Sequence, residues 1–263
     1  MIRDSAPKHD PSQVCGTAAS PATQGATANR SATVETLRQR IARLEAGHPP
    51  RDRSPVSSTC PALDALLPAG GFRPGTLVEW LAGAEGSGAM EWALRTAGAA
   101  MREGGVLVVL DRRGEFYPPA AVQRGIDVER LIVVQASEEA DYGWALDQVL
   151  RSSAVAAALA WAERMEGHAF RRLQLAAEEG GGLGLFIRPA AARQEPSWAD
   201  VRVLVEPRPA GPAAERRWRL DILRCRGGVE GVSIDVELDD GSHLVPLVAQ
   251  LAAPARLRRA AGM

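Results

Sequence analysis

The glycine-rich stretch Gly83–Met90 has a spacing that could bind phosphate. A working P-loop reads G-x-x-x-x-G-K-[ST], in which backbone N–H groups surround the phosphates, the lysine contacts them and the hydroxyl holds Mg²⁺. Gly83 and Gly88 occupy the two glycine positions, but Ala89 stands at the lysine position and Met90 at the hydroxyl position. The stretch therefore has the glycines of a phosphate cradle without its charged and metal-binding groups.

Other side chains with reactive chemistry are scattered along the chain. The three cysteines show no metal-ligand spacing and form no even disulfide set, so we expect free thiols. The four histidines share no metal-binding spacing either. Gly86-Ser87-Gly88 has the wrong glycine offsets for the G-x-S-x-G turn of a serine hydrolase. We therefore expect no metal site and no catalytic nucleophile.

Length, charge and hydropathy narrow the function classes. The chain has 263 residues, which suits one larger domain with extensions. Its 31 Lys and Arg residues balance 32 Asp and Glu residues, so no overall positive field favours nonspecific nucleic-acid binding. There is no apolar run of about 18 residues that would cross a membrane, and no continuous apolar N-terminal segment of a secretion signal. We therefore expect a cytoplasmic protein that does not engage a membrane.

Alternating strand and helix patterns surround the glycine loop. A strand over 76–80 leads into the loop, and a helix over 90–101 follows it. The continuous apolar run over 106–110 is typical of a strand buried on both faces of a parallel sheet. Residues 155–161 are apolar and alanine-rich, which fits a strand or the start of a helix. Similar patterns predict strands over 131–134 and 183–187, and helices over 118–124, 140–150 and 170–179. This alternation predicts a parallel α/β sheet.

The C-terminal third has a different pattern. Apolar and polar residues alternate over 199–206, 217–226 and 232–238, which is typical of antiparallel strands with one solvated face. The predicted fold class is therefore α/β, with a central, mainly parallel sheet flanked by helices and antiparallel strands toward the C-terminus.

The chain divides into four predicted segments. Residues 1–32 contain few large apolar side chains, so we expect a disordered tail. Residues 33–56 comprise a helix and a linker; apolar residues at i, i+3, i+7 and i+10 from Val34 mark one helix face. The arginines off that face predict a solvated surface or, alternatively, a short docking helix for a partner. Residues 57–250 form the compact domain, and residues 251–263 form a short basic tail.

Two segments resemble the core of RecA-type recombinases. The stretch 63–79, Leu-Asp-Ala-Leu-Leu-Pro-Ala-Gly-Gly-Phe-Arg-Pro-Gly-Thr-Leu-Val-Glu, is similar to the approach of recombinases to their P-loop. Asp111–Pro118 is similar to the segment after the next recombinase strand. The predicted order of strands and helices agrees, so the resemblance implies a RecA-like domain over 57–250.

From about residue 34 to residue 240 the chain more closely resembles the ImuA family, RecA-like proteins of a bacterial damage-inducible mutagenesis cassette. Each matching segment alone is weakly specific, but their order makes the resemblance specific. The segments are the helix over 34–44, Leu66–Leu77, Arg171–Glu178, Leu185–Pro189 and Trp218–Gly228. The resemblance does not cover residues 1–30. It implies SOS-induced, error-prone translesion DNA synthesis with an ImuB-like Y-family polymerase homologue, an error-prone C-family DNA polymerase and RecA as candidate partners.

A RecA-like ATPase also needs a carboxylate that orients the attacking water. Recombinases place it two residues after the position of Asp111, where this chain has Arg113. Glu115 lies two residues out of register. Asp111 itself is either a remnant catalytic carboxylate or a strand-end residue that caps a loop.

A second acidic residue should end a central strand and hold Mg²⁺. The matching stretch 155–161 has no carboxylate, and the next one along the chain is Glu163. With this loss, three elements of ATP hydrolysis are missing, so we predict no hydrolysis, no nucleotide cofactor and no catalytic residue. Weak anion binding at the helix N-terminus after Gly88 stays an alternative.

Arginines lie near the segment where recombinases carry DNA-binding loops. They predict a DNA-facing or partner-facing basic patch, or alternatively charge that neighbouring Glu and Asp balance in water. The candidates are Arg171, Arg172, Arg188, Arg224 and Arg226. The loop over 190–196 is short and contains no aromatic residue for base stacking, so we expect weak independent filament formation on DNA.

These observations favour a catalytically inactive RecA-like adaptor that binds ImuB, RecA or both, with indirect or weak DNA contact. The resemblance implies that it associates with the nucleoid on DNA damage. Two alternatives stay open. One is an atypical DNA-dependent ATPase of the RecA family, in which arginines or partner residues replace the missing groups. The other is an SOS-induced inhibitor of cell division.

Overall fold

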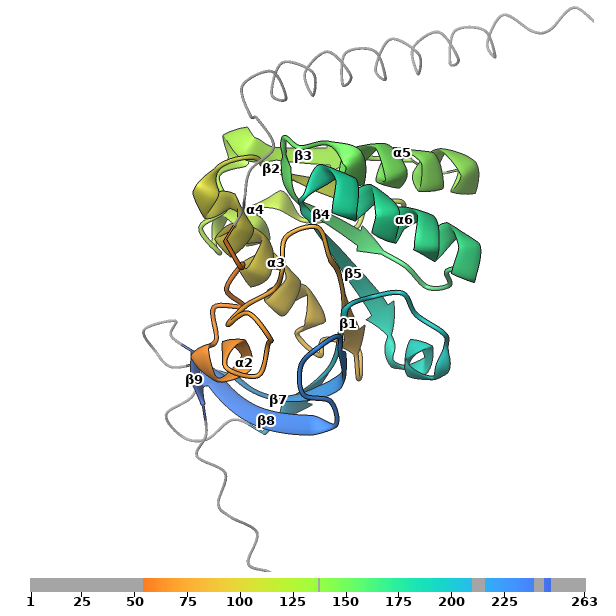
Figure 1. The fold of residues 1–263 in the computed structure, drawn as a ribbon. Helices are drawn as coiled ribbons and strands as arrows, with labels where there is room; N and C mark the ends of the chain where they lie inside the picture. Colours follow the sequence, from red (N-terminus) through yellow and green to blue (C-terminus); the bar gives the residue numbers. More distant parts are fainter. Residues whose placement is uncertain (1–53, 137, 210–215, 239–243, 247–263) are drawn as a thin grey trace, which may run out of the picture. The chain divides into compact units, whose positions relative to one another are not determined.

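A computed structural model describes residues 54–136, 138–209, 216–238 and 244–246, and a mixed sheet organises them (Figure 1). The strands are β1 (Leu77–Ala82), β2 (Val106–Leu110), β3 (Leu131–Val134), β4 (Val155–Trp161), β5 (Leu183–Pro189), β6 (Val201–Arg208), β7 (Arg216–Cys225), β8 (Val232–Leu238) and β9 (Leu244–Pro246). Their order in the described part of the sheet is β3-β2-β4-β5-β1-β6-β7-β8-β9. The pairs from β3 to β6 are parallel, and β7, β8 and β9 continue antiparallel.

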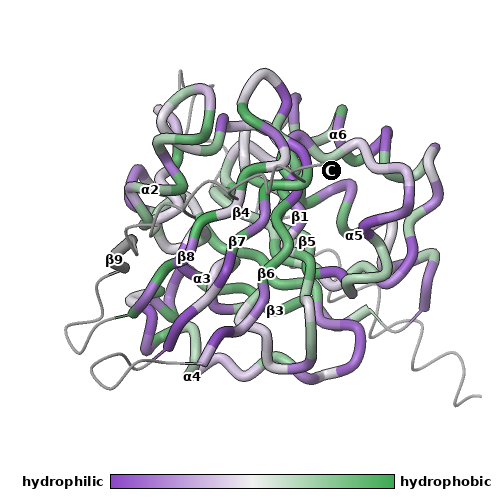
Figure 2. The backbone as a smooth tube through the Cα atoms, turned by 90° about the horizontal axis from the view of Figure 1, so that it is seen from below, coloured by the Kyte–Doolittle hydropathy of each residue, from purple (hydrophilic) through white to green (hydrophobic). Residues whose placement is uncertain are grey.

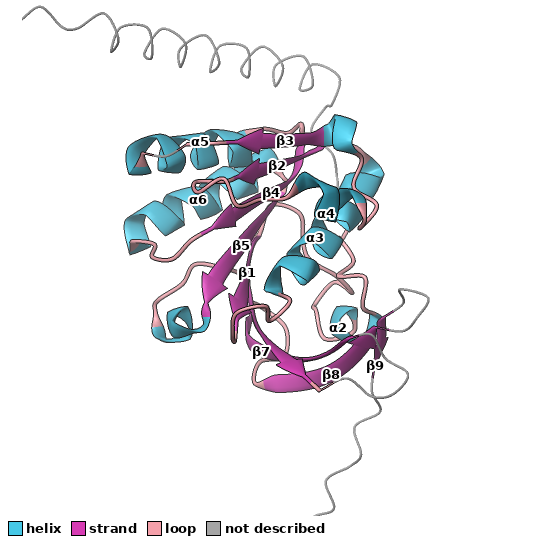
Figure 3. Ribbon diagram, turned by 180° about the vertical axis from the view of Figure 1, so that it is seen from behind, coloured by secondary structure: helices cyan, strands magenta, loops and turns pink. Residues whose placement is uncertain are grey.

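Helices pack on both faces of this sheet (Figures 1 and 3). Their bounds are Pro61–Asp64 for α2, Ala89–Ala100 for α3, Pro118–Val122 for α4, Glu139–Arg151 for α5 and Gly167–Gly180 for α6. Short 3₁₀ turns lie at Met101–Glu103 (η1), Val128–Arg130 (η2) and Ala190–Gln194 (η3). One hydrophobic cluster joins α3 to the sheet, and another joins α5 and α6 to its other face. None of the described helices is both long and apolar enough to span a membrane.

The central strands are buried because most of their side chains are apolar on both faces. Hydrophobic segments gather in the middle of Figure 2, and hydrophilic segments lie mostly around the periphery. The alanine-rich run that fitted a strand or a helix start is β4, and only Trp161 at its end is partly exposed. Small side chains on β4 leave space for α3, α5 and α6, which cover the two faces of the sheet. The predicted α/β fold, mainly parallel and flanked by helices, is confirmed.

The antiparallel prediction for residues 199–206 is confirmed on one side of β6 and wrong on the other. This strand pairs in parallel with β1 and antiparallel only with β7, so it is the last parallel strand. Its alternating pattern suggested a solvated face because Arg202 stands among apolar residues, yet Arg202 is 7% exposed. The guanidinium is buried against Glu79. A buried arginine in an ion pair therefore gives the same alternating pattern as a strand with one solvated face.

Several sequence predictions fall outside the described residues. These are the tail over 1–32, the helix and most of the linker in 33–56, and the basic tail over 251–263. The proposed segment boundaries stay predictions.

Candidate functional site

The glycine loop joins the carboxyl end of β1 to the amino end of α3. Gly88 precedes the helix with φ of 93°, in the left-handed region that disfavours side chains. A Cβ at Gly88 would lie 2.2 Å from Trp218 Nε1, and a Cβ at Gly83 would lie 2.9 Å from Val205 O. Close packing therefore requires both glycines whether or not the loop binds phosphate.

The positions that would serve a nucleotide are packed inward. Ala89, at the lysine position, is 3% exposed, and Met90, at the hydroxyl position, packs against the hydrophobic cluster on α3. The loop also uses two of its own N–H groups. Ser87 N donates to Ala84 O at 3.1 Å, and Ala89 N contacts Ser87 Oγ at 3.4 Å. Two donors that could have faced a phosphate are thus satisfied within the loop.

Four aromatic rings form a continuous row next to the loop. The ring centroids of Phe72 and Trp80 lie 5.8 Å apart, those of Trp80 and Trp92 6.0 Å, and those of Trp92 and Trp218 5.7 Å. All four side chains are at most 2% exposed. Because the Trp218 ring reaches Gly88 from β7, the row connects the antiparallel strands to the glycine loop. This end of the sheet is a packed core.

Asp111 closes the loop that follows β2. Its carboxylate accepts three backbone N–H groups from residues 114–116, at distances of 2.8 to 3.1 Å, and the residue is 3% exposed. Arg113, at the water-orienting position, is exposed and forms an ion pair with Glu163, the first carboxylate after β4. Neither position that would hold a catalytic carboxylate has one. Arg113 occupies the first, in the loop that Asp111 caps, and β4 ends without an acidic residue.

Glu91 lies in the first turn of α3, directly after the glycine loop. Arg124 Nε donates to it at 2.6 Å and Arg95 Nε at 2.7 Å, and the Glu91 side chain is 6% exposed. Burial on its own would raise the pKa of Glu91, but the hydrogen bonds from Arg124 and Arg95 outweigh burial and lower this pKa. The carboxylate is therefore a structural anion that ties α3 to the loop after α4.

A buried cluster of four charged side chains joins β1, β5 and β6. Glu79 accepts from Arg188 Nη1 at 2.7 Å and from Arg202 Nε at 2.5 Å, and Glu79 is fully buried. Arg188 Nη2 also donates to Glu195 at 2.5 Å. Arg202 Nη2 donates to the carbonyl of Ala192 in η3 at 2.6 Å. The cluster therefore fixes the connection between β5 and β6 to the sheet.

Arg188 was a candidate for DNA or partner binding, and the structure contradicts that prediction. The residue is 1% exposed, and its guanidinium contacts two carboxylates and the carbonyl of Ala162. A buried guanidinium needs such partners because removing its charge from water is costly. Arg188 is therefore a structural residue of the β-sheet.

Three other predicted arginines converge on the segment before β6. Arg171 lies over the Trp198 ring, with 5.1 Å between Cζ and the ring centroid. Arg224 Nη1 donates to the Ser197 carbonyl at 2.6 Å, and Arg226 contacts Asp200 at 3.4 Å. The fifth candidate, Arg172, lies on α6 and contacts Asp147 of α5 at 3.3 Å. The structure thus brings together Arg171, Arg224 and Arg226, which are distant in sequence.

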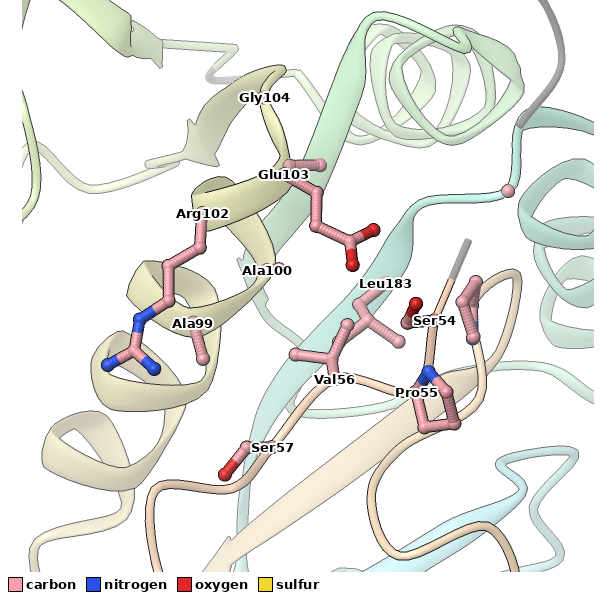
Figure 4. Close-up of a pocket in the computed structure, with 13 residues that line it drawn as sticks. Ser54, Pro55, Val56, Ser57, Ala99, Ala100, Arg102, Glu103, Gly104 and Leu183 are labelled. Atoms are coloured by element: carbon pink, nitrogen blue, oxygen red, sulfur yellow. The ribbon is translucent and has the colours of Figure 1, made fainter. Parts of the chain in front are cut away.

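A cavity of about 180 Å³ lies at the opposite end of α3 from the glycine loop (Figure 4). Residues 54–57, the end of α3 with η1, Ala156 and Leu183 line it. Its volume is below the roughly 300 Å³ at which ligand pockets usually begin. Since it is distant from the glycine loop, it does not replace the missing nucleotide site.

The described cysteines fit the prediction of free thiols. Cys60 and Cys225 are both unpaired and buried, and burial raises the pKa of each thiol. Both side chains belong to the hydrophobic cluster that joins α3 to the sheet, so they contribute to packing. Cys15 lies outside the described residues.

Comparison with known proteins identifies the family. The model of the RecA N-terminal domain matches residues 38–161. Protein ImuA of Caulobacter vibrioides strain NA1000 is 36% identical over 232 residues, which cover 80% of this chain and 94% of that protein. The chain belongs to the ImuA family.

More limited matches connect the chain to RecA itself. Protein RecA of Lactococcus lactis strain MG1363 is 37% identical over 90 residues, which cover 34% of this chain and 22% of that protein. Protein RecA of Chlorobaculum parvum is 33% identical over 100 residues, 38% of this chain and 28% of that protein. The resemblance to ImuA thus extends over most of the chain, whereas the resemblance to RecA covers a portion of it. A DNA-damage role and a RecA-like domain follow from the family.

Four residues that organise this region were not among the predicted site residues. Trp218 and Glu79 are buried in elements that were predicted, but neither side chain was singled out. Arg202 was interpreted as part of a solvated alternation. Trp198 lies two residues beyond the loop that was searched for an aromatic, and it is 45% exposed. A signal was present only for Trp198, because an exposed tryptophan beside basic residues is a common recognition feature.

Proposed function

We propose that this ImuA-family chain is a RecA-like adaptor without ATPase activity in SOS-induced, error-prone translesion DNA synthesis. It acts by binding an ImuB-like Y-family polymerase homologue, RecA or both, next to an error-prone C-family DNA polymerase. Its DNA contact is indirect or weak. The observation that carries the proposal is the packing at the glycine loop, where Ala89 is 3% exposed.

The groups that would neutralise a nucleotide's charge are missing from the loop. A nucleotide triphosphate brings several negative charges, and P-loop proteins neutralise them with a lysine, Mg²⁺ and directed N–H groups. Here Ala89, at the lysine position, lies in the apolar core. The Ser87 N–H donates to the Ala84 carbonyl within the loop, so it is not directed at a ligand. Arg113 and Glu163, at or near the remaining catalytic positions, neutralise each other. Without the lysine and the catalytic carboxylates, the loop has a structural role, and the proposed partner binding uses surfaces elsewhere on the domain.

Phosphate release measures the enzymatic part of the proposal. The purified full chain with ATP, Mg²⁺ and single-stranded DNA should stay at background, while RecA under the same conditions turns over. A titration with a fluorescent ATP analogue should show no saturable binding. Turnover that an Asp111→Asn substitution abolishes would instead establish the atypical ATPase.

Co-purification from DNA-damaged cells measures the adaptor part. We expect ImuB or RecA to be recovered with the tagged chain at stoichiometric levels, and we expect direct binding when both proteins are purified. Recovery of division proteins, together with filamentous cells on overexpression without damage, would support the division inhibitor and contradict the adaptor.

A further inference from the structure

Three large apolar side chains on the α5 and α6 side of the sheet are partly exposed to solvent. Trp144 is 42% exposed, Leu175 45% and Trp198 45%. Single exposed apolar residues are normal on a protein surface, but contiguous ones mark interaction sites. Tryptophan is also among the residues that contribute most to binding energy at protein interfaces.

Helical spacing and two contacts of α6 with its neighbours relate the positions of these three side chains. Arg171 lies over Trp198, and Leu175 is one turn further along the same side of α6. Arg172, three residues before Leu175, contacts Asp147 of α5 at 3.3 Å. Trp144 precedes Asp147 by three residues, so it shares a side of α5 with that contact. We refer to Trp144, Arg171, Arg172, Leu175 and Trp198 as the Trp198 face.

The charge on this face is positive. Arg171 bonds the neutral Gln174 side chain and lies over the indole, and Arg224 bonds the Ser197 carbonyl, so these contacts leave both guanidinium charges uncompensated. Arg172 is 56% exposed, whereas its partner Asp147 is only 12% exposed. Arg226 and Asp200 show the same difference, at 62% and 14%. The cationic groups therefore reach outward while the two carboxylates lie beneath them.

Acidic side chains stand at both ends of α6: Glu166 directly precedes the helix, and Glu178 and Glu179 lie in its last turns. Glu179 pairs with Arg151, and Glu178 accepts from Gln174 Nε2 at 3.2 Å. The positive region therefore lies between Glu166 and Glu178 on α6 and extends to the segment before β6. A partner that covers this region needs negative charge over the arginines and an apolar side chain between Trp198 and Leu175.

We infer that the Trp198 face binds an acidic segment of a protein partner, which places a large apolar side chain between Trp198 and Leu175. The inference rests on the proposed adaptor function and specifies the surface that performs it. Single-stranded DNA would use the arginines and an aromatic face. It would gain little from the aliphatic Leu175, and Arg171 already covers part of the Trp198 ring, so a protein segment fits the face better.

The test measures the affinity of the full chain for purified ImuB-like protein, for RecA and for a 30-nucleotide oligo-dT. The variants are Trp198→Ala and Arg171→Glu. Tyr117→Ala is the matched control, because Tyr117 is an aromatic residue that is 67% exposed near α4. Thermal melting and circular dichroism verify that each variant is folded. We expect Trp198→Ala and Arg171→Glu each to weaken binding of one protein partner at least tenfold, as interface tryptophans and arginines typically do. Tyr117→Ala should stay within twofold.

The outcomes separate this inference from the proposed function. Binding of a partner by the wild type that both variants retain would overturn the Trp198 face and leave the adaptor intact. Loss of oligo-dT binding with unchanged partner affinity would overturn it in favour of a nucleic-acid surface. If the wild type binds neither protein, the adaptor proposal itself fails. An Arg171→Lys variant should recover part of the lost affinity, because it keeps the positive charge.

Discussion

At the glycine loop, positions that face phosphate in ATPases are packed into the core, whereas on the Trp198 face large aromatic side chains extend into solvent. Trp218 beside the loop is 2% exposed, and Trp198 is 45% exposed. The two regions share one sheet, and their tryptophans serve opposite purposes. One tryptophan completes an interior, and the other offers apolar area with an arginine over it. The contrast teaches that the glycine loop contributes packing to the fold, whereas the proposed recognition surface lies on the outside of the same sheet.

The buried charges sharpen this contrast. Glu79, Arg188 and Arg202 form ion pairs between strands, out of contact with solvent. Arg171 and Arg172 carry the same charge on α6, and Arg172 is 56% exposed. An arginine in this chain is therefore informative only with its surroundings: the buried ones hold the connection between β5 and β6, and the exposed ones belong to the proposed binding face.

The largest expected effect separates the two tryptophans. Trp218→Ala should lower the free energy of unfolding by about 3–5 kcal/mol, because it removes a buried ring and leaves a cavity beside Trp92. Trp198→Ala should change it by about 0.5 kcal/mol or less, as expected for a surface position. Urea denaturation of both variants measures the difference. Equal losses of unfolding free energy in the two variants would show that Trp198 is a core residue, and would contradict the distinction between the two regions.

A second pair of variants tests whether the glycine loop is held by packing. Gly88→Ala should destabilise the protein by about 2–4 kcal/mol, because a left-handed alanine costs about 1–2 kcal/mol and the added methyl meets Trp218. Gly86 has φ of 67° but open space around its Cβ position. Gly86→Ala should therefore show only the conformational part, about 1 kcal/mol. Matching losses in the two variants would mean that the Trp218 contact contributes nothing.

Much of the sheet could be predicted because its strands are apolar on both faces. The runs 106–110 and 131–134 coincide with β2 and β3, and the helical spacing in 170–179 lies within α6. The sequence also identified the altered loop positions, since Ala89 and Met90 differ chemically from lysine and threonine whatever their surroundings.

What failed depends on contacts between distant residues. Arg188 and Arg202 have the composition of surface residues, and only the approach of Glu79, from a strand more than a hundred residues away, buries them. The grouping of Arg171 with Trp198 likewise arises from the path of the chain between β5 and β6. Periodicity describes one element at a time, so it cannot report an ion pair between elements.

The smallest expected effect concerns pH and Glu91, which anchors α3 behind the glycine loop. Because its pKa is lower in the folded protein than in the unfolded chain, the carboxylate stabilises the fold at pH values above the unfolded pKa of about 4.3. That contribution is lost as pH falls from there through the folded pKa. At pH 7, Glu91→Gln should lower the free energy of unfolding by about 1.5 kcal/mol, the typical contribution of a hydrogen bond to a charged group. Denaturation of both proteins from pH 7 down to pH 3 should show this difference shrinking below pH 4.3. A difference that stays constant over the range would mean that the arginine contacts of Glu91 do not favour its charged form, and that the anchor beside the glycine loop works through packing alone.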